Sequence, residues 1–222
     1  MNVLLFGATG MVGQGVLREC LLDPDVQSVK AIGRTATEIQ NPKLRDIVHP
    51  DLWNYSTLES ELGNLDACFF CLGIASAGMT EADYERVTCA IPVAAGKILS
   101  RLNPNMTFIF VSGAGTDNSE RGRIMWARIK GKAENALMKL PFKGTYAFRP
   151  GIIQPLNGAK SKTKLYRFFY ALTGPILPLL GMLFPNHVTT TERNGQAMLR
   201  ITRKGFPKTV LESRDINAAA DF

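Results

Sequence analysis

The chain has 222 residues, of which 45% are hydrophobic and 20% charged, and its formal net charge is +7. No linker-like or low-complexity run divides it, so size and composition predict one domain over residues 1–222 and exclude a disordered protein. Because Met1 lies one residue from the first apolar run and the four cysteines suit a reducing compartment, we expect a cytoplasmic protein without a signal or transit peptide.

The first predicted element is an aliphatic strand that runs into three glycines spaced three apart, Gly7, Gly10 and Gly13. Gly7 permits a sharp turn, Gly10 has no Cβ to hold off a pyrophosphate, and Gly13 lets the next helix pack closely on the sheet. The N-terminus of that helix would present free amides to phosphates. An ordinary tight turn is the alternative. The pattern predicts a dinucleotide site that includes these glycines together with Thr9, Met11 and Val12.

The second predicted strand, Val26 to Ile32, is followed by Gly33 and Arg34. A site specific for NAD places an acid about twenty residues after the glycines, and no acid lies between Asp25 and Glu38. Arg34 can pair with a 2′-phosphate and stack on adenine, so the sequence favours NADP. A solvent-exposed arginine is the alternative.

The third predicted strand, Asp46 to Val48, and the fourth, Asp66 to Leu72, are each followed by candidate cofactor contacts. After the third come Asp51, whose carboxylate would reach the adenine amino group, and Leu52; a capping role for Asp51 is equally open. After the fourth, we expect Leu72 and Gly73 to lie against the cofactor, with Gly73 leaving room for it.

Two other features of this region have structural interpretations. Cys68 and Cys71 are three apart in a strand and therefore point to opposite faces, which favours core positions over a redox pair. Neither these cysteines nor the two histidines have companion ligands, so no metal site is expected. The next helix is predicted to start at Thr80 and to kink at Pro92.

The fifth predicted strand, Met106 to Val111, ends at Ser112, and the helix after it carries Trp126 and Lys130. The sixth, Thr145 to Phe148, ends in Arg149-Pro150-Gly151. Strands and helices alternate throughout. This order predicts an α/β protein with a Rossmann-type, doubly wound parallel sheet of about seven strands and ligands at the carboxyl ends of the strands.

Together these motifs resemble the short-chain dehydrogenase/reductase superfamily, in its atypical, extended branch of NAD(P)-dependent epimerase/dehydratase-like proteins, near the Tat-interacting-protein oxidoreductase group. The resemblance implies that Ser112 orients a substrate oxygen, that Lys130 holds the nicotinamide ribose, and that Pro150, Gly151 and Ile152 contact the cofactor. Trp126 occupies the position of the family's tyrosine.

Trp126 leads to two hypotheses about the function. An indole N–H donates a hydrogen bond but exchanges no proton near neutral pH, so Trp126 cannot act as the general acid. One hypothesis is an NADP-dependent oxidoreductase with a non-standard site, for which Tyr84 is a candidate acid. The other is a non-catalytic, NADPH-binding redox sensor or regulatory protein.

The last part of the chain is predicted to hold the substrate region. Residues 152–190 form an inserted lid or substrate-binding segment, and within it 160–184 turn from basic to strongly apolar, which predicts an apolar small-molecule substrate or a peripheral membrane contact. Residues 121–170 hold twelve Lys or Arg and a single acid, Glu134, which indicates an anionic ligand. No nucleic-acid-binding motif accompanies them. A helix at Thr191 to Arg203, a strand at Thr209 to Leu211 and a helix at Asp215 to Ala220 return the chain to the sheet.

Overall fold

In the computed structural model, residues 1–159 and 186–222 are described. Their main feature is a seven-stranded sheet in the order β3-β2-β1-β4-β5-β6-β9, in which every neighbouring pair is parallel. The strands are β1 (Asn2–Phe6), β2 (Ser28–Gly33), β3 (Leu44–Val48), β4 (Ala67–Phe70), β5 (Thr107–Val111), β6 (Gly144–Arg149) and β9 (Val210–Glu212). The predicted doubly wound parallel sheet is confirmed.

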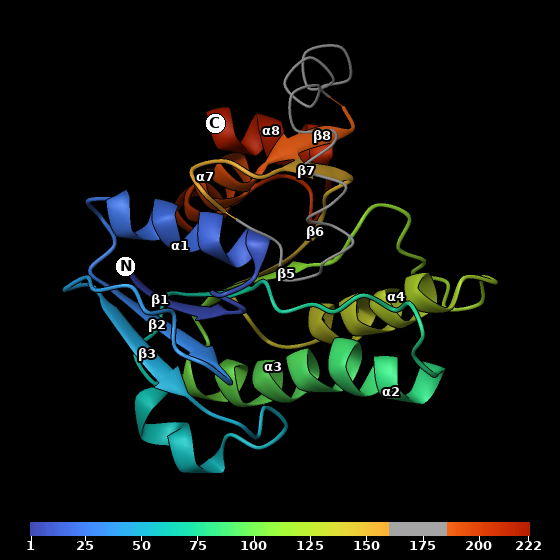
Figure 1. Ribbon diagram of the computed structural model, residues 1–222, viewed down its shortest axis with the longest axis horizontal. Helices are drawn as coiled ribbons and strands as arrows, with labels where there is room; N and C mark the ends of the chain where they lie inside the picture. Colours follow the sequence, from blue (N-terminus) through green and yellow to red (C-terminus); the bar gives the residue numbers. More distant parts are fainter. Residues whose placement is uncertain (160–185) are drawn as a thin grey trace.

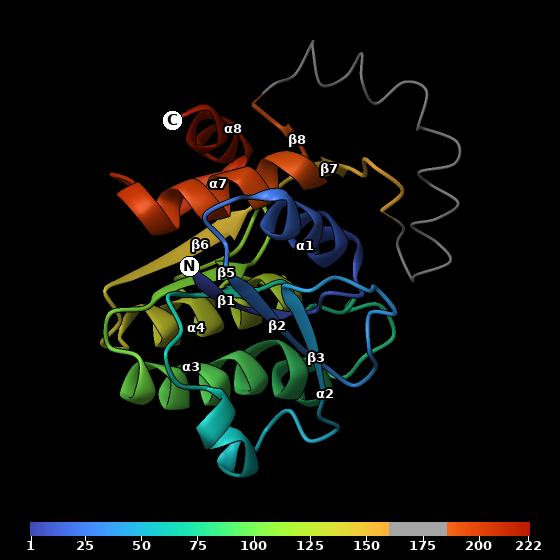
Figure 2. The same ribbon diagram turned by 90° about the vertical axis from the view of Figure 1, so that its left-hand side faces the viewer.

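Helices cover both faces of the sheet (Figures 1 and 2). One layer consists of α1 (Met11–Leu22), α7 (Thr191–Lys204) and α8 (Ser213–Asp221), and the other of α2 (Glu81–Glu85), α3 (Ile91–Leu102) and α4 (Met125–Met138). Two apolar clusters fill the space between sheet and helices, one on each face. Cys68 belongs to one cluster and Cys71 packs against the other, as strand alternation requires.

The helix after β4 begins where the sequence predicts, because the Thr80 side chain accepts a hydrogen bond from the backbone N–H of Asp83. It winds as a π-helix over Arg86–Ala90 before α3 begins. Pro92 lies two residues after this segment and has no N–H to donate to the carbonyl of Thr88, so the regular helical hydrogen bond is missing at the position of the predicted kink.

Three elements were not predicted. The 3-10 helix Ser56–Glu61 follows β3. The short strands β7 (Ile152–Gln154) and β8 (Val188–Thr190) pair in parallel as a separate sheet. They lie at the two ends of the predicted insertion 152–190, most of which, including the membrane-contact stretch 160–184, falls outside the described residues. Within the described part of the chain, no helix has the length and apolar character needed to cross a membrane.

Candidate active site

A cleft of about 830 Å³ opens at the carboxyl ends of the central strands. This edge is where doubly wound sheets bind ligands. The cleft brings together residues from eight separate parts of the chain, which are Gly7–Val12, Ala31–Thr35 with Thr37, Asp46, Leu52, Cys71–Ala75, Val111–Ser112, Lys130, and Pro150–Gly151 with Ile153.

One end of the cleft is the glycine turn between β1 and α1. Gly7 has φ +77°, and a Cβ on Gly13 would lie 2.0 Å from the carbonyl oxygen of Gly7, so both positions need glycine. Gly10 caps α1 without a side-chain hydrogen bond, and no acid lies in the first turn. The amides at this helix end are therefore directed at the cleft with no internal anion to satisfy them. The turn fits the pyrophosphate of a dinucleotide.

The next part of the cleft lies at the ends of β2 and β3. Arg34 is exposed at its rim, and no ion pair or hydrogen bond engages its guanidinium in the part of the chain that the structure describes. Asp46 also lines the cleft and accepts hydrogen bonds from the backbone and hydroxyl of Thr37, at 3.1 and 2.8 Å. The unpaired guanidinium of Arg34 and the hydrogen-bonded carboxylate of Asp46 therefore lie at the same end of the cleft.

Asp51 and Leu52 are adjacent, yet only Leu52 lines the cleft. The Asp51 carboxylate instead accepts a hydrogen bond from the backbone N–H of Trp53 at 3.1 Å, the turn-capping role that the sequence left open. A similar one-residue difference separates Ile152, which is 39% exposed, from Ile153, which lines the cleft. Successive side chains of β7 point to opposite sides, and the predicted contact fell on the outward one.

The wall after β4 contains Leu72 and Gly73, as the sequence indicates. A Cβ on Gly73 would meet no atom within 4 Å and would project into open space. No packing within the described protein therefore requires glycine here, whereas a ligand lying against the backbone would.

Lys130 reaches from α4 to the end of β5, where its Nζ donates a hydrogen bond to the backbone oxygen of Ser112 at 2.6 Å. Burial lowers the pKa of Lys130 to about 8, against the smaller opposing effect of the negative charge on Glu134. The ammonium group of Lys130, which lines the cleft, therefore gives up its proton more readily than that of an exposed lysine.

The Ser112 side chain is 5% exposed, and its Oγ lies 2.8 Å from the Oγ1 of Thr116. Thr116 in turn donates from Oγ1 to the carbonyl oxygen of Gly113 at 2.7 Å. No sequence motif pointed to Thr116, because it lies in a loop with no periodic pattern. Only the turn of residues 112–116 brings the two hydroxyl groups together.

Trp126 and Tyr84 are not among the residues that line the cleft. Trp126 packs against one core cluster, with its ring 3.5 Å from where a Cβ of Gly115 would be. Tyr84 is 1% exposed within the same cluster, so the structure does not support it as the proton donor. Among the described residues, the cleft's titratable nitrogen nearest to Ser112 is that of Lys130.

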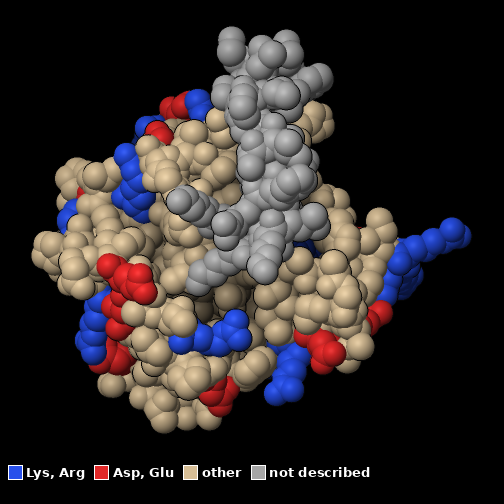
Figure 3. Space-filling model, viewed as in Figure 1, with Lys and Arg blue, Asp and Glu red and all other residues tan. Residues whose placement is uncertain are grey.

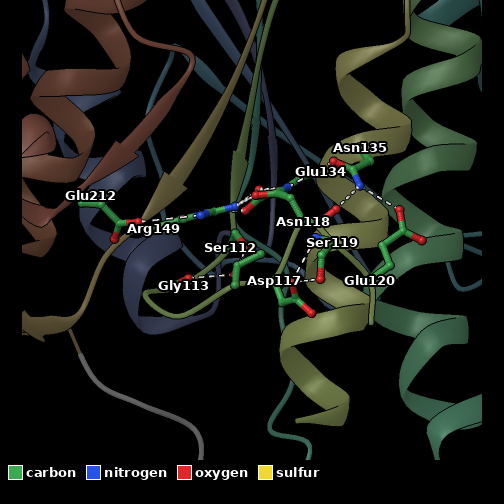
Figure 4. Close-up of polar contacts among 11 residues, drawn as sticks. Ser112, Gly113, Asp117, Asn118, Ser119, Glu120, Glu134, Asn135, Arg149 and Glu212 are labelled. Carbon is green, nitrogen blue, oxygen red and sulfur yellow. Dashed lines mark hydrogen bonds and ion pairs between the residues drawn. The ribbon is translucent and has the colours of Figure 1, made fainter. Parts of the chain in front are cut away.

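Behind the cleft, a buried ion pair joins α4 to β6 (Figure 4). Arg149 donates from Nε to Glu134 at 3.0 Å and pairs with it through a second nitrogen at 2.5 Å, and Glu134 is 1% exposed. Asn118, in the loop after β5, donates to the same carboxylate at 2.9 Å and also accepts from Arg149. This network ties the loop that carries Thr116 to α4.

Part of the basic excess of residues 121–170 is matched by acids that are distant in the sequence. Arg128 pairs with Glu81 at 2.8 Å and Lys132 with Glu85 at 2.6 Å, and both acids come from α2. Figure 3 shows Lys and Arg side chains beside Asp and Glu side chains on the face drawn. Among the described residues of this segment, Lys130 is therefore better evidence for an anionic ligand than the net charge of the segment is.

No family model matches the chain. Among curated proteins, it is 27% identical over 183 residues to "Protein fmp52, mitochondrial" of Emericella nidulans, covering 79% of this chain and 77% of the relative. It is 29% identical over 186 residues to the protein of the same name from Aspergillus fumigatus, covering 79% and 76%. These relatives are similar over most of both chains.

Solved structures match over nearly the whole chain. The Bordetella bronchiseptica enzyme WbmF in complex with NAD+ superposes with a TM-score of 0.69 at 13% identity, covering 99% of this chain and 76% of that one. The oxidoreductase ylbE from Lactococcus lactis gives 0.66 at 15% identity, covering 100% and 95%. At these identities the likeness establishes the fold alone, and that fold is the one that the resemblance implied.

The curated relatives contradict the cytoplasmic location that the sequence led us to expect, since they are named as mitochondrial proteins. The expectation rested on the first strand lying next to Met1. The position of a strand in a fold reflects packing and gives no information about a compartment, so the inference was wrong.

Proposed function

We propose that this protein, which has the fold of the extended short-chain dehydrogenases/reductases, is an oxidoreductase that binds NADP(H) and transfers a hydride to or from an apolar small molecule. The observation that supports it best is that one cleft holds both an uncapped helix N-terminus at a glycine turn and, at the strand ends, Lys130. Turnover of NADPH with a panel of apolar carbonyl and enone compounds tests the proposal.

The cofactor would supply the hydride, and the chain's own residues would bind and orient it. The amides of Met11 and Val12 would hold the pyrophosphate, and Lys130 would donate to hydroxyl groups of the nicotinamide ribose. Leu72, Gly73, Pro150 and Gly151 line the same cleft and would form the walls around the dinucleotide.

The cofactor preference rests on Arg34. We expect NADPH to bind about tenfold tighter than NADH, and Arg34→Ala to remove that preference, because a charge-assisted hydrogen bond contributes about 1.5 to 3 kcal/mol. Arg45→Ala is the matched control, since Arg45 is exposed and paired with Glu61 away from the cleft. Titration of both cofactors against the three proteins measures this. Equal affinities in the wild type would contradict the assignment and would favour Asp46 as the selector of a ribose hydroxyl.

The apolar character of the substrate is supported by apolar side chains that line the cleft. Cys71, Ile74, Ala75, Val111 and Ile153 line the cleft together with Ser112 and Lys130. An apolar molecule with one oxygen to place between these two groups suits this wall.

Lys130 is our candidate for the group that exchanges the proton, because Trp126 cannot. In the family the tyrosine stands one helical turn before this lysine, on the same side of the helix. Because the family's tyrosine is absent, we expect ordinary ketones to be poor substrates, and Trp126→Tyr to raise the rate for at least one of them. Trp53→Tyr, at an exposed tryptophan outside the cleft, is the control. Brisk ketone reduction by the wild type would show that the chemistry does not need a tyrosine here.

A second candidate function is favoured by the same tryptophan. A protein that binds NADPH without turnover, and changes partners with the redox state, would keep the glycine turn and need no proton donor. Crystals soaked with NADPH separate the two. Open space over the nicotinamide supports a substrate and the enzyme, whereas a nicotinamide covered by protein supports the sensor.

The relatives support a mitochondrial location for this protein. Fractionation of cells that express a tagged chain in its own organism tests it. Recovery with the mitochondrial fraction is expected, and recovery in the soluble cytosolic fraction alone would contradict it.

A further inference from the structure

The three oxygen atoms at the end of β5 form a short chain, in which the Oγ of Ser112 lies 2.8 Å from the Oγ1 of Thr116, and that oxygen lies 2.7 Å from the carbonyl oxygen of Gly113. Two oxygen atoms this close repel each other unless a hydrogen atom lies between them. Each of the two contacts therefore needs its own hydrogen.

The hydrogen atoms can be assigned by counting. A carbonyl oxygen has none, so the contact with Gly113 uses the single hydroxyl hydrogen of Thr116. The contact between the two side chains must then use the hydroxyl hydrogen of Ser112. Gly113 receives a further hydrogen bond from the backbone N–H of Thr116 at 3.2 Å, which holds the turn in place.

The consequence is a fixed direction for the Ser112 hydroxyl. Its hydrogen points away from the cleft toward Thr116, and only its lone pairs face the ligand. Both side chains are buried, at 5% and 8% exposure, so bulk water does not compete for these bonds. At this point the cleft offers a hydrogen-bond acceptor, whereas a carbonyl ligand would require a donor.

We propose that Thr116 is a positioning residue that turns the Ser112 hydroxyl into an acceptor, so that the cleft selects ligands with a hydrogen-bond donor, an alcohol in preference to the corresponding ketone. The inference rests on the proposed function for the identity of the ligand. Lys130, which contacts the backbone oxygen of Ser112 at 2.6 Å, supplies donors beside it. A ligand hydroxyl can donate to Ser112 and accept from Lys130, whereas a ketone can only accept.

The matched probes are cyclohexanol and cyclohexanone, measured in non-reacting ternary complexes, the alcohol with NADPH and the ketone with NADP+. We expect the wild type to favour the alcohol. Thr116→Val removes the acceptor, frees the Ser112 hydroxyl to donate into the cleft, and should shift the ratio of the two dissociation constants about tenfold toward the ketone. Thr116→Ser keeps the hydroxyl and should retain the wild-type ratio. An unchanged ratio in Thr116→Val would overturn the inference.

Neutron diffraction from crystals of the deuterium-exchanged wild type tests the same inference without a ligand and without a variant that has to fold. Deuterium on Ser112, directed at Thr116, supports it. Deuterium on Thr116 directed at Ser112 overturns it. Failure of both cofactors to bind would instead count against the proposed function and leave the result of the neutron experiment standing.

Discussion

Lys130→Met should lower the rate of NADPH-dependent reduction about a hundredfold or more, since proton transfer by a positioned side chain contributes about 10² to 10⁴ in rate. The wild-type rate should fall as the pH rises through about 8, because the ammonium group that donates the proton is lost there. Initial rates between about pH 6 and about pH 9 at saturating substrate measure both effects.

Lys132→Met is the matched control for this prediction. Lys132 lies two residues further along the same helix, is exposed, and pairs with Glu85 outside the cleft. It should retain the wild-type rate and pH profile. A flat wild-type profile together with an active Lys130→Met variant would contradict a proton-transferring role and leave Lys130 at most a ribose contact.

The same residue makes stability depend on pH, and this gives a readout that is independent of activity. The pKa of Lys130 is about 8 in the folded protein and has its ordinary value of 10.5 when unfolded, so between these values the unfolded chain binds more protons. Stability contributed by this group therefore rises with pH through that window. Lys130→Met should remove that part of the rise, which urea unfolding of both proteins at the two ends of the window would show.

Arg149→Met should destabilise the protein by about 3 to 5 kcal/mol, because it leaves the Glu134 carboxylate buried without its cation. For a chain of this size that corresponds to a fall in melting temperature of roughly 6 to 20 °C. Thermal unfolding at neutral pH measures it. Because Arg149 and Asn118 also hold the loop after β5, the loss should include the ordered position of that loop.

Two further variants test whether the buried charge causes this loss. Arg101→Met breaks the exposed pair with Glu59 and should cost less than about 1 kcal/mol. The double replacement Arg149→Met with Glu134→Leu removes both charges and should be more stable than Arg149→Met alone. If the double variant is the less stable of the two, the cost comes from lost packing and not from an unpaired charge.

The sequence by itself determined the parts of this protein whose signals are local. Apolar runs followed by glycine predicted where the central strands lie, because a strand covered on both faces has to be apolar along its whole length. The three-residue spacing of Gly7, Gly10 and Gly13 located the turn, because it needs residues without a Cβ at those points. Lys130 was also found from its place in the order of motifs.

Tertiary structure alone decided the features that depend on contacts between distant or irregular segments. The rotation of a loop decided that Leu52, and not Asp51, faces the cleft, and the rotation of a three-residue strand decided the same for Ile153 over Ile152. No periodic pattern in the sequence records such a rotation. The pairing of Arg149 with Glu134 and the parallel pair β7–β8 join segments that are brought together by the sheet. Thr116 meets Ser112 through a tight turn, so the direction of that hydroxyl follows from geometry that residue types alone do not specify.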